Sequence, residues 1–348
     1  MDVEPHAAEV LPTHTPELFA AVVRRAADLL RAGEVVALPT ETVYGLAANA
    51  LDARAVAKIY EAKGRPAHNP IIVHVADLAL ARRCVRVWPE AAARLAKSFW
   101  PGPLTLVLPR AGEIPDIVTA GGDTVGVRWP SHPFMQAVIR ECGFPLAAPS
   151  ANLSNQVSPT NAEHVRQGLG GRISFIVDGG QSQVGIESTV VDVSGAAVRV
   201  LRPGMIHVSA LASALGDLPM PLDEAVSSKS DAAAAEPLRS PGLLERHYAP
   251  TARLMVCTWQ DDDDLQSQLA VYRAHAARTF VIAHTRILSG TNFGGVSVIS
   301  HDAEAYARAL YAELHRCDVE GAELIVVEAP PPGPEWAAIA DRLRRASA

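Results

Sequence analysis

The chain has 348 residues, of which 49% are hydrophobic and 20% are charged, and its formal net charge is −7. The length suits two domains, the apolar content excludes a disordered chain, and the acidic balance argues against a protein that wraps nucleic acid. Four well-separated cysteines without a CxxC pair argue against a zinc site or a disulfide framework. No segment approaches the roughly 20 apolar residues of a membrane helix, and the first ten residues lack the features of a signal peptide. We therefore expect a cytoplasmic protein with no membrane partner.

The first 215 residues predict alternating helices and strands. The first helix begins after Thr15, a good N-cap residue, has Pro16 in its first turn, and ends before Gly33. Further helices are expected at 52–63, 89–99, 133–141 and 161–168. Short apolar runs predict strands at 35–38, 71–75, 104–108, 124–128, 145–148, 174–177, 188–193 and 198–201. Because strands cluster near the end of this region, a mixed sheet is favoured over a purely parallel one.

The segment 216–250 has a different composition, because the stretch SSKSDAAAAEP is small, polar and without periodicity. It predicts a linker. Beyond it, strands are expected at 253–257, 280–283, 296–299 and 324–328, and helices at 261–276, 302–316 and 334–345. Repeated strand–helix units predict a small parallel sheet with helices on both faces.

The segment PTETVYGL follows the strand at 35–38. Ligands bind at strand ends in α/β sheets, and its two threonine hydroxyls and one carboxylate could hold a small polar ligand. An ordinary turn is an equally good interpretation.

A second polar segment carries Lys63 and Arg65 on a loop stiffened by Gly64 and by prolines. A rigid lysine and arginine together suit a polyphosphate, although both could merely complement the end of a helix. His74 lies in the following strand, where a histidine is usually a core residue, but the basic loop beside it makes a ligand role plausible.

Arg128 ends an apolar strand and therefore needs a partner. A substrate carboxylate is one candidate, and a structural aspartate or glutamate is the other. The later segment 149–160 is rich in small hydroxyl residues that offer donors to an anion. The sequence has no Walker A motif, no GxGxxG motif after a strand and no nucleophile elbow, and no serine or cysteine sits in a recognisable triad pattern, so a covalent nucleophile is not indicated.

Taken together and in this order, these segments resemble the Sua5/YciO/YrdC family, and specifically its two-domain Sua5 type. The matching segments, between residues 39 and 250, are PTETVYGL, KGRPAHNPIIVHV, SFWPGPLTLVL, VGVRWPSHP, PLAAPSANLSNQVSPT, DGGQSQVGIESTVVD, LRPGMI and SPGLLERHYAP. The region beyond them matches only in length and strand–helix pattern. The resemblance implies an α/β fold with three parts: a YrdC-like catalytic domain on a twisted mixed sheet at 1–215, a linker or lid over the active site at 216–250, and a small Rossmann-like parallel α/β domain at 251–348.

The resemblance also implies an activity, that of an L-threonylcarbamoyladenylate synthase. Such a nucleotidyltransferase condenses L-threonine, bicarbonate or CO2, and ATP with Mg2+ to threonylcarbamoyl-AMP and pyrophosphate. Its product passes to the tRNA threonylcarbamoyl transferase machinery, as the first step of threonylcarbamoyladenosine formation in tRNA. No stable nucleic-acid binding is expected. The alternative is a double-stranded-RNA-binding module on the same fold.

Carried over residue by residue, the resemblance implies two neighbouring sets of side chains, with Lys63 and Arg65 as catalytic groups and no metal ligands. The set around L-threonine is Thr42, His74, Arg128, the backbone of Ala148, and Ser188, with Arg128 pairing with the substrate carboxylate. The set around ATP is Arg65, Asn69, Thr124, Ser150, Ser158, Arg202 and Tyr248. Tyr248 would reach back from the linker as part of a lid, and packing between the domains is its alternative. Asn155 stands where the family usually has glycine, and we expect little effect because asparagine tolerates a left-handed turn.

Overall fold

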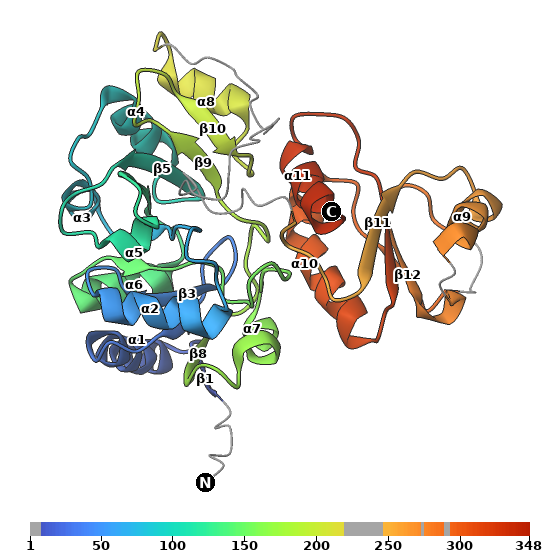
Figure 1. Cartoon of the computed structure of the whole chain (residues 1–348), viewed down its shortest axis with the longest axis horizontal. Helices are drawn as coiled ribbons and strands as arrows, with labels where there is room; N and C mark the ends of the chain where they lie inside the picture. Colours follow the sequence, from blue (N-terminus) through green and yellow to red (C-terminus); the bar gives the residue numbers. More distant parts are fainter. Residues whose placement is uncertain (1–7, 219–245, 273–274, 289–292) are drawn as a thin grey trace. The chain divides into compact units, whose positions relative to one another are not determined.

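The computed structural model describes residues 8–218, 246–272, 275–288 and 293–348, which form two compact units (Figure 1). Of the segment 216–250 expected to be a linker, residues 219–245 lie outside the described residues. The first unit holds the described residues up to 218, except for two short segments. Those segments, Asn155–Ser158 and Val184–Ile186, belong to the second unit together with residues 246–348. The chain therefore contributes to the second unit well before the expected linker.

The first unit is built on a mixed sheet, as the sequence predicts. Among the described residues the strand order is β1-β8-β2-β3-β7-β4-β6-β5-β9-β10. It contains parallel pairs such as β4 with β6 and antiparallel pairs such as β5 with β6. The strands are β1 (Glu9–Pro12), β2 (Val36–Leu38), β3 (Gly45–Asn49), β4 (Val73–His74), β5 (Leu104–Pro109), β6 (Thr124–Arg128), β7 (Leu146–Ala147), β8 (Phe175–Asp178), β9 (Thr189–Asp192) and β10 (Arg199–Arg202).

Helices lie on both faces of this sheet. Successive residues of a strand point to opposite faces, and accordingly Val36 and Leu38 of β2 join one apolar cluster whereas Ala37 joins another. The first cluster includes Leu30 of α1, and the second includes Ile59 of α2. The helices are α1 (Pro16–Arg31), α2 (Ala53–Lys63), α3 (Leu78–Arg83), α4 (Glu90–Phe99), α5 (Asp116–Thr119), α6 (Pro133–Cys142), α7 (Ala162–Leu169) and α8 (Val208–Leu215).

The helix ends follow the sequence signals closely. The Thr15 hydroxyl accepts a hydrogen bond from the Leu18 amide at 3.2 Å and so begins α1. The Asp52 carboxylate accepts from two amides at the start of α2, and that helix ends at Gly64 in the left-handed conformation, with φ of 59°. This ending places Lys63 on the last turn of α2 and Arg65 directly beyond it.

The second unit has a smaller sheet in which all the observed strand pairs are parallel, in the order β11-β14-β12-β13. In Figure 1, α10 and α11 lie on one side of this sheet and α9 on the other, which confirms the predicted parallel α/β arrangement. The elements are β11 (Arg253–Cys257), α9 (Asp262–Leu269), β12 (Thr279–Ala283), β13 (Gly295–Val298), α10 (Ala303–Val319), β14 (Leu324–Glu328) and α11 (Ala337–Ala346).

One predicted helix is too long. The sequence predicts a helix over 261–276, but α9 ends at Leu269 and is followed by two short 3-10 turns, Ala270–Tyr272 and Ala276–Arg278. The physical reason is that Val271, an apolar residue within the predicted range, is 81% exposed. Without a buried face to pack, continuation of the α-helix has little tertiary support.

Candidate active site

Three of the residues expected around L-threonine lie on neighbouring strands or directly after one. His74 of β4 is directly opposite Arg128 in the parallel pair of β4 with β6. On its other side β4 pairs with β7, where His74 is opposite Leu146. Ala148 follows β7 and donates its backbone N–H to the Ile72 carbonyl at 3.0 Å. The sheet thus brings together residues that are up to 74 positions apart in the chain.

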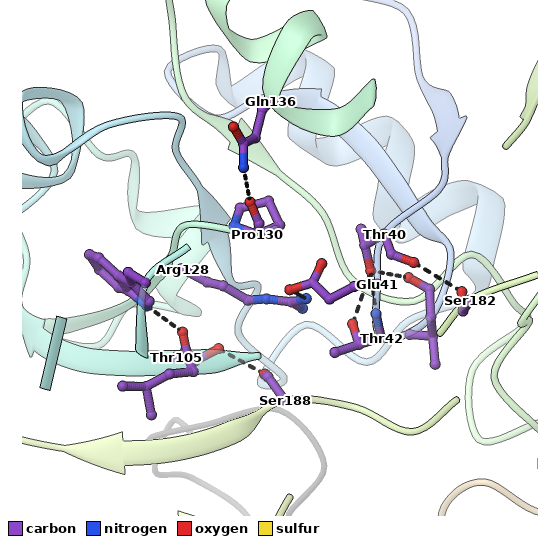
Figure 2. A network of polar contacts seen from close by, with 12 residues as sticks. Thr40, Glu41, Thr42, Thr105, Arg128, Pro130, Gln136, Ser182 and Ser188 are labelled. Atoms are coloured by element: carbon purple, nitrogen blue, oxygen red, sulfur yellow. Dashed lines mark hydrogen bonds and ion pairs between the residues drawn. The ribbon is translucent and has the colours of Figure 1, made fainter. Parts of the chain in front are cut away.

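The loop between β2 and β3 is buried and internally hydrogen-bonded (Figure 2). The Thr40 hydroxyl donates to the Val43 carbonyl at 2.6 Å and lies 2.9 Å from the Thr42 hydroxyl. Because the Thr40 proton is engaged at Val43, the Thr42 hydroxyl is the donor of that second bond. The Ser182 hydroxyl donates to the Thr40 carbonyl at 3.0 Å and closes the loop from another segment. These contacts hold Thr42 and the intervening Glu41 in fixed positions.

Arg128 pairs with Glu41 in this structure. Its Nη2 lies 2.8 Å from Oε1 of Glu41, and the two side chains are only 5% and 4% exposed. Figure 2 shows the guanidinium of Arg128 pointing toward this carboxylate. Burial raises the pKa of Glu41, but the charge of Arg128 and hydrogen bonds from Arg128 and from the backbone of Ser131 and Glu41 together outweigh it, so the pKa lies below its ordinary value. Of the two partners that the sequence left open for Arg128, the glutamate is the one seen here.

His74 is a neutral residue in this environment. Burial, reinforced by the positive charge of Arg128, lowers the pKa of His74 to about 3. Its Nδ1 atom is buried and makes no hydrogen bond within the described parts of the chain. A neutral imidazole with one open ring nitrogen can hydrogen-bond to a ligand.

Ser188 lies just before β9 and joins the two expected sets of residues. Its hydroxyl is 2.8 Å from that of Thr105 on β5. Figure 2 draws this hydrogen bond as a dashed line. Arg202, at the end of β10, donates from Nε to the Ser188 carbonyl at 3.1 Å and from Nη2 to the Ser188 hydroxyl at 3.1 Å. A residue expected at ATP therefore contacts a residue expected at L-threonine.

Lys63 and its neighbours form a second cluster in the first unit. The buried Lys63 ammonium donates to the Ser150 carbonyl at 2.6 Å and to both oxygens of Asn152. Burial, together with the charge of Arg65, holds the pKa of Lys63 well below its usual range. Arg65 donates from Nε and Nη2 to the backbone and side-chain oxygens of Asn69, at 3.0 and 2.8 Å. Asn152 belongs to the hydroxyl-rich segment singled out in the sequence, but its contact with Lys63 was not predicted.

The remaining residues expected at ATP are placed as follows. Thr124 begins β6 and lines a small cavity that Pro70 also lines. Ser158 and Tyr248 belong to the second unit, where the Nε2 atom of His315 lies 3.2 Å from the Ser158 carbonyl. Nearby in the chain, Asn155 adopts a φ of 69°, which confirms that asparagine serves at this left-handed position.

Tyr248 packs within the second unit. Its ring stacks on Tyr311, with centroids 6.1 Å apart, and the Arg342 guanidinium lies 5.2 Å from the ring centroid. His247 contacts it edge-on at 4.0 Å. The sequence alternatives for Tyr248, a lid or packing between the domains, did not include these contacts.

The described residues offer neither a metal centre nor a membrane-spanning helix. Among them, no three His, Cys, Asp or Glu side chains converge in a way that could hold a metal ion. Within the same residues, the helices are all too short or too polar to cross a bilayer.

The chain is similar to known proteins over nearly its whole length. Residues 28–204 match the Sua5_yciO_yrdC family, described as "Telomere recombination", and residues 206–348 match the family described as "Threonylcarbamoyl-AMP synthase, C-terminal domain". The threonylcarbamoyl-AMP synthase of Bacillus subtilis is 42% identical over 340 residues, 97% of this chain and 94% of that protein. Its counterpart in Pyrococcus abyssi is 39% identical over 329 residues, 93% of this chain and 94% of that protein.

A solved structure extends the comparison to the fold. The crystal structure of P. abyssi Sua5 complexed with L-threonine is 38% identical to this chain, with a TM-score of 0.86, and the match covers 97% of this chain and 96% of that one. The resemblance predicted from the sequence motifs is confirmed, and the chain belongs to the Sua5/YciO/YrdC family in its two-domain Sua5 form.

Proposed function

We propose that the protein is a threonylcarbamoyl-AMP synthase, which condenses L-threonine, bicarbonate or CO2, and ATP to L-threonylcarbamoyl-AMP and pyrophosphate. The observation that carries the proposal is the similarity to synthases of that name over at least 93% of the chain. The geometry of the first unit agrees with it, because a buried Arg128–Glu41 pair lies among hydroxyl groups and a second cluster carries Lys63 and Arg65. Such a division suits one amino acid and one polyphosphate.

For L-threonine, we assign the carboxylate to the guanidinium of Arg128. The neutral His74, the Thr42 and Ser188 hydroxyls and the backbone of Ala148 then surround the rest of the molecule. The P. abyssi protein was crystallised as a complex with L-threonine, and its 38% identity to this chain supports the same ligand here.

For ATP, we assign the cationic side chains to the phosphates. Lys63, Arg65 and Arg202 would offset the triphosphate charge, and Arg65 would in addition keep the Asn69 loop in place. The remaining groups expected at the nucleotide are Thr124, Ser150, Ser158 and Tyr248. Mg2+ would enter bound to the ATP phosphates, where it neutralises charge. The cationic and hydroxyl character of this set fits a metal held mainly by phosphate oxygens.

The chemistry needs positioning more than a side-chain nucleophile. The threonine amine loses a proton and forms an N–C bond to CO2, which gives a carbamate. A carbamate oxygen then forms a bond to the α-phosphorus of ATP, and the bond to the β-phosphate oxygen breaks, so pyrophosphate leaves. Groups that hold the reactants in line and stabilise the departing charge accelerate such a transfer. Lys63 and Arg65 are the catalytic groups in this proposal.

We infer that bicarbonate is the source of CO2 and that the product is transferred to the tRNA threonylcarbamoyl transferase machinery. We also infer that the reaction takes place in the cytoplasm. The acidic net charge of −7 supports a small-molecule enzyme without stable nucleic-acid binding.

The test is pyrophosphate release by the full chain with ATP and Mg2+. Release should require both L-threonine and bicarbonate, and omission of either should reduce it to the background rate. Equal release without L-threonine would contradict the proposal. A filter-binding assay with double-stranded RNA provides a second readout, in which little retention is expected.

A further inference from the structure

The buried pair of Glu41 and Arg128 carries more polar atoms than its own contact satisfies. Nη2 of Arg128 lies 2.8 Å from Oε1 of Glu41 as an ion pair. That contact is not a hydrogen bond of good geometry, and within the part of the chain that the structure describes Oε2 of Glu41 and Nε of Arg128 lack such a bond as well. The backbone of Ser131 and of Glu41 itself gives the carboxylate some further stabilisation. Buried polar atoms in proteins are nearly always hydrogen-bonded. Buried charged groups whose hydrogen bonding is this incomplete therefore point to a ligand that supplies further partners.

The charges at this place restrict the chemistry of that ligand. A carboxylate ligand alone would put two carboxylates against one guanidinium in a buried site, and like charges so close together are unfavourable. An α-amino acid adds no net charge, because its ammonium group accompanies its carboxylate. The neutral but dipolar pair of Glu41 and Arg128 thus complements a zwitterion.

We propose that Glu41 recognises the α-ammonium group of the amino-acid substrate and so selects an amino acid over the hydroxy acid of the same shape. The inference rests on the proposed function, which assigns the substrate carboxylate to Arg128. Thr40 and Ser182 support it, since their hydrogen bonds hold the loop that carries Glu41. The charge of Arg128 supports it too, since the lowered pKa of Glu41 keeps the carboxylate ionised as an acceptor.

The experiment compares two ligands of the full-length protein by titration calorimetry. One is L-threonine, and the other is the 2,3-dihydroxybutanoate of matching configuration, which has a hydroxyl in place of the ammonium group. A charge-assisted hydrogen bond corresponds to about ten- to a hundredfold in affinity. The wild type should therefore bind L-threonine tighter by about that factor. Glu41→Gln should weaken the binding of L-threonine by the same factor. It should not weaken the binding of the dihydroxy acid, whose carboxylate no longer meets a second carboxylate beside Arg128.

Two further variants guard against a folding defect, because Glu41→Gln leaves the buried Arg128 without an anion. Glu41→Asp keeps the charge, so it should retain the preference for L-threonine while binding it less tightly than the wild type does. Glu34→Gln is the matched control, since Glu34 makes an exposed ion pair with Lys58, and its affinities should equal those of the wild type.

Two results would overturn the inference. One is equal binding of the two ligands by the wild type, which needs no variant to fold. The other is an equal loss of affinity for both ligands in Glu41→Gln, which would mean that Glu41 only orients Arg128. Either result is compatible with threonine-dependent pyrophosphate release, so the proposed function would survive it. Absence of that release, with neither ligand bound, would overturn both the proposed function and this inference.

Discussion

Arg202 and Ser188 are joined by two hydrogen bonds, one from Nε to the serine carbonyl and one from Nη2 to its hydroxyl, each 3.1 Å long. The two residues were assigned to different substrates, Arg202 to ATP and Ser188 to L-threonine. If that assignment holds, their contact links the two halves of the candidate site within the first unit. A substitution of Arg202 should therefore alter KM for both substrates.

Arg202→Lys tests this coupling. Lysine carries the charge but cannot reproduce the planar fork of donors that reaches both oxygens of Ser188. We expect KM to rise about three- to tenfold for ATP and for L-threonine alike, in steady-state pyrophosphate release. Arg199→Lys, on the same strand but exposed, should leave both values unchanged. An increase confined to ATP would show that the contact does not couple the substrates.

Arg65→Ala and Arg128→Ala should separate the two substrates. Loss of one charge-assisted contact costs roughly 1.5–3 kcal/mol. Arg65→Ala should therefore raise KM for ATP by about tenfold or more and change KM for L-threonine little, whereas Arg128→Ala should do the reverse. Arg54→Ala, exposed on α2, is the control. If both variants changed only the ATP titration, the division of the site would be wrong.

Much of the fold could be predicted because local signals and tertiary structure agree. The bounds predicted for β6 and β14 are those observed, since each is a short apolar run between clear breaks. The sequence analysis missed β3 (Gly45–Asn49), because GLAAN has no β-branched or aromatic residue. Its strand conformation depends on pairing with β2 and β7, which lie on either side of it.

The side-chain partners within the site could not be predicted in the same way. Lys63 and Asn152 each lie in a segment that the sequence singled out, but they are 89 positions apart, and only the fold shows that they touch. Glu41 and Arg128 are likewise separate signals until the loop before β3 meets the end of β6. Residue type and local pattern predict which segments form a site, whereas the partner of each charge depends on long-range strand pairing.

The low pKa of His74 predicts a specific acid sensitivity. In the fold His74 stays neutral down to about pH 3, while in the unfolded chain it takes up a proton below about 6.5. Between these two pH values the unfolded state therefore binds more protons than the folded state. As a result, the free energy of unfolding falls by about 1.4 kcal/mol for each pH unit by which the pH is lowered. The free energy of unfolding can be measured with urea at pH 7.5 and at pH 5. Between these two pH values, that of the wild type should fall by about 2 kcal/mol more than that of His74→Gln.

His14→Gln provides the control for that measurement, because His14 is exposed. Its unfolding free energy should follow the wild type at both pH values. If His74→Gln also followed the wild type, His74 would not be held neutral by the fold.

Tyr248 offers a test of whether the chain after residue 245 takes part in catalysis or only packs. As a lid residue, Tyr248→Ala would reduce activity and leave Tm nearly unchanged. Its ring, however, contacts Tyr311 and the Arg342 guanidinium within the second unit. Truncating such a buried aromatic costs about 3–5 kcal/mol, so we now expect Tyr248→Ala to lower Tm clearly. Tyr248→Phe keeps the ring contacts and should melt close to the wild type.

The two roles can still be separated by measuring KM for ATP well below the Tm of each variant. If Tyr248 takes part in nucleotide binding, Tyr248→Ala should raise KM for ATP by about tenfold at a temperature where it is fully folded. Tyr272→Ala is the matched control, because Tyr272 belongs to the same unit and is 36% exposed. A wild-type KM for ATP in folded Tyr248→Ala would remove Tyr248 from the nucleotide site and leave it as a packing residue of the second unit.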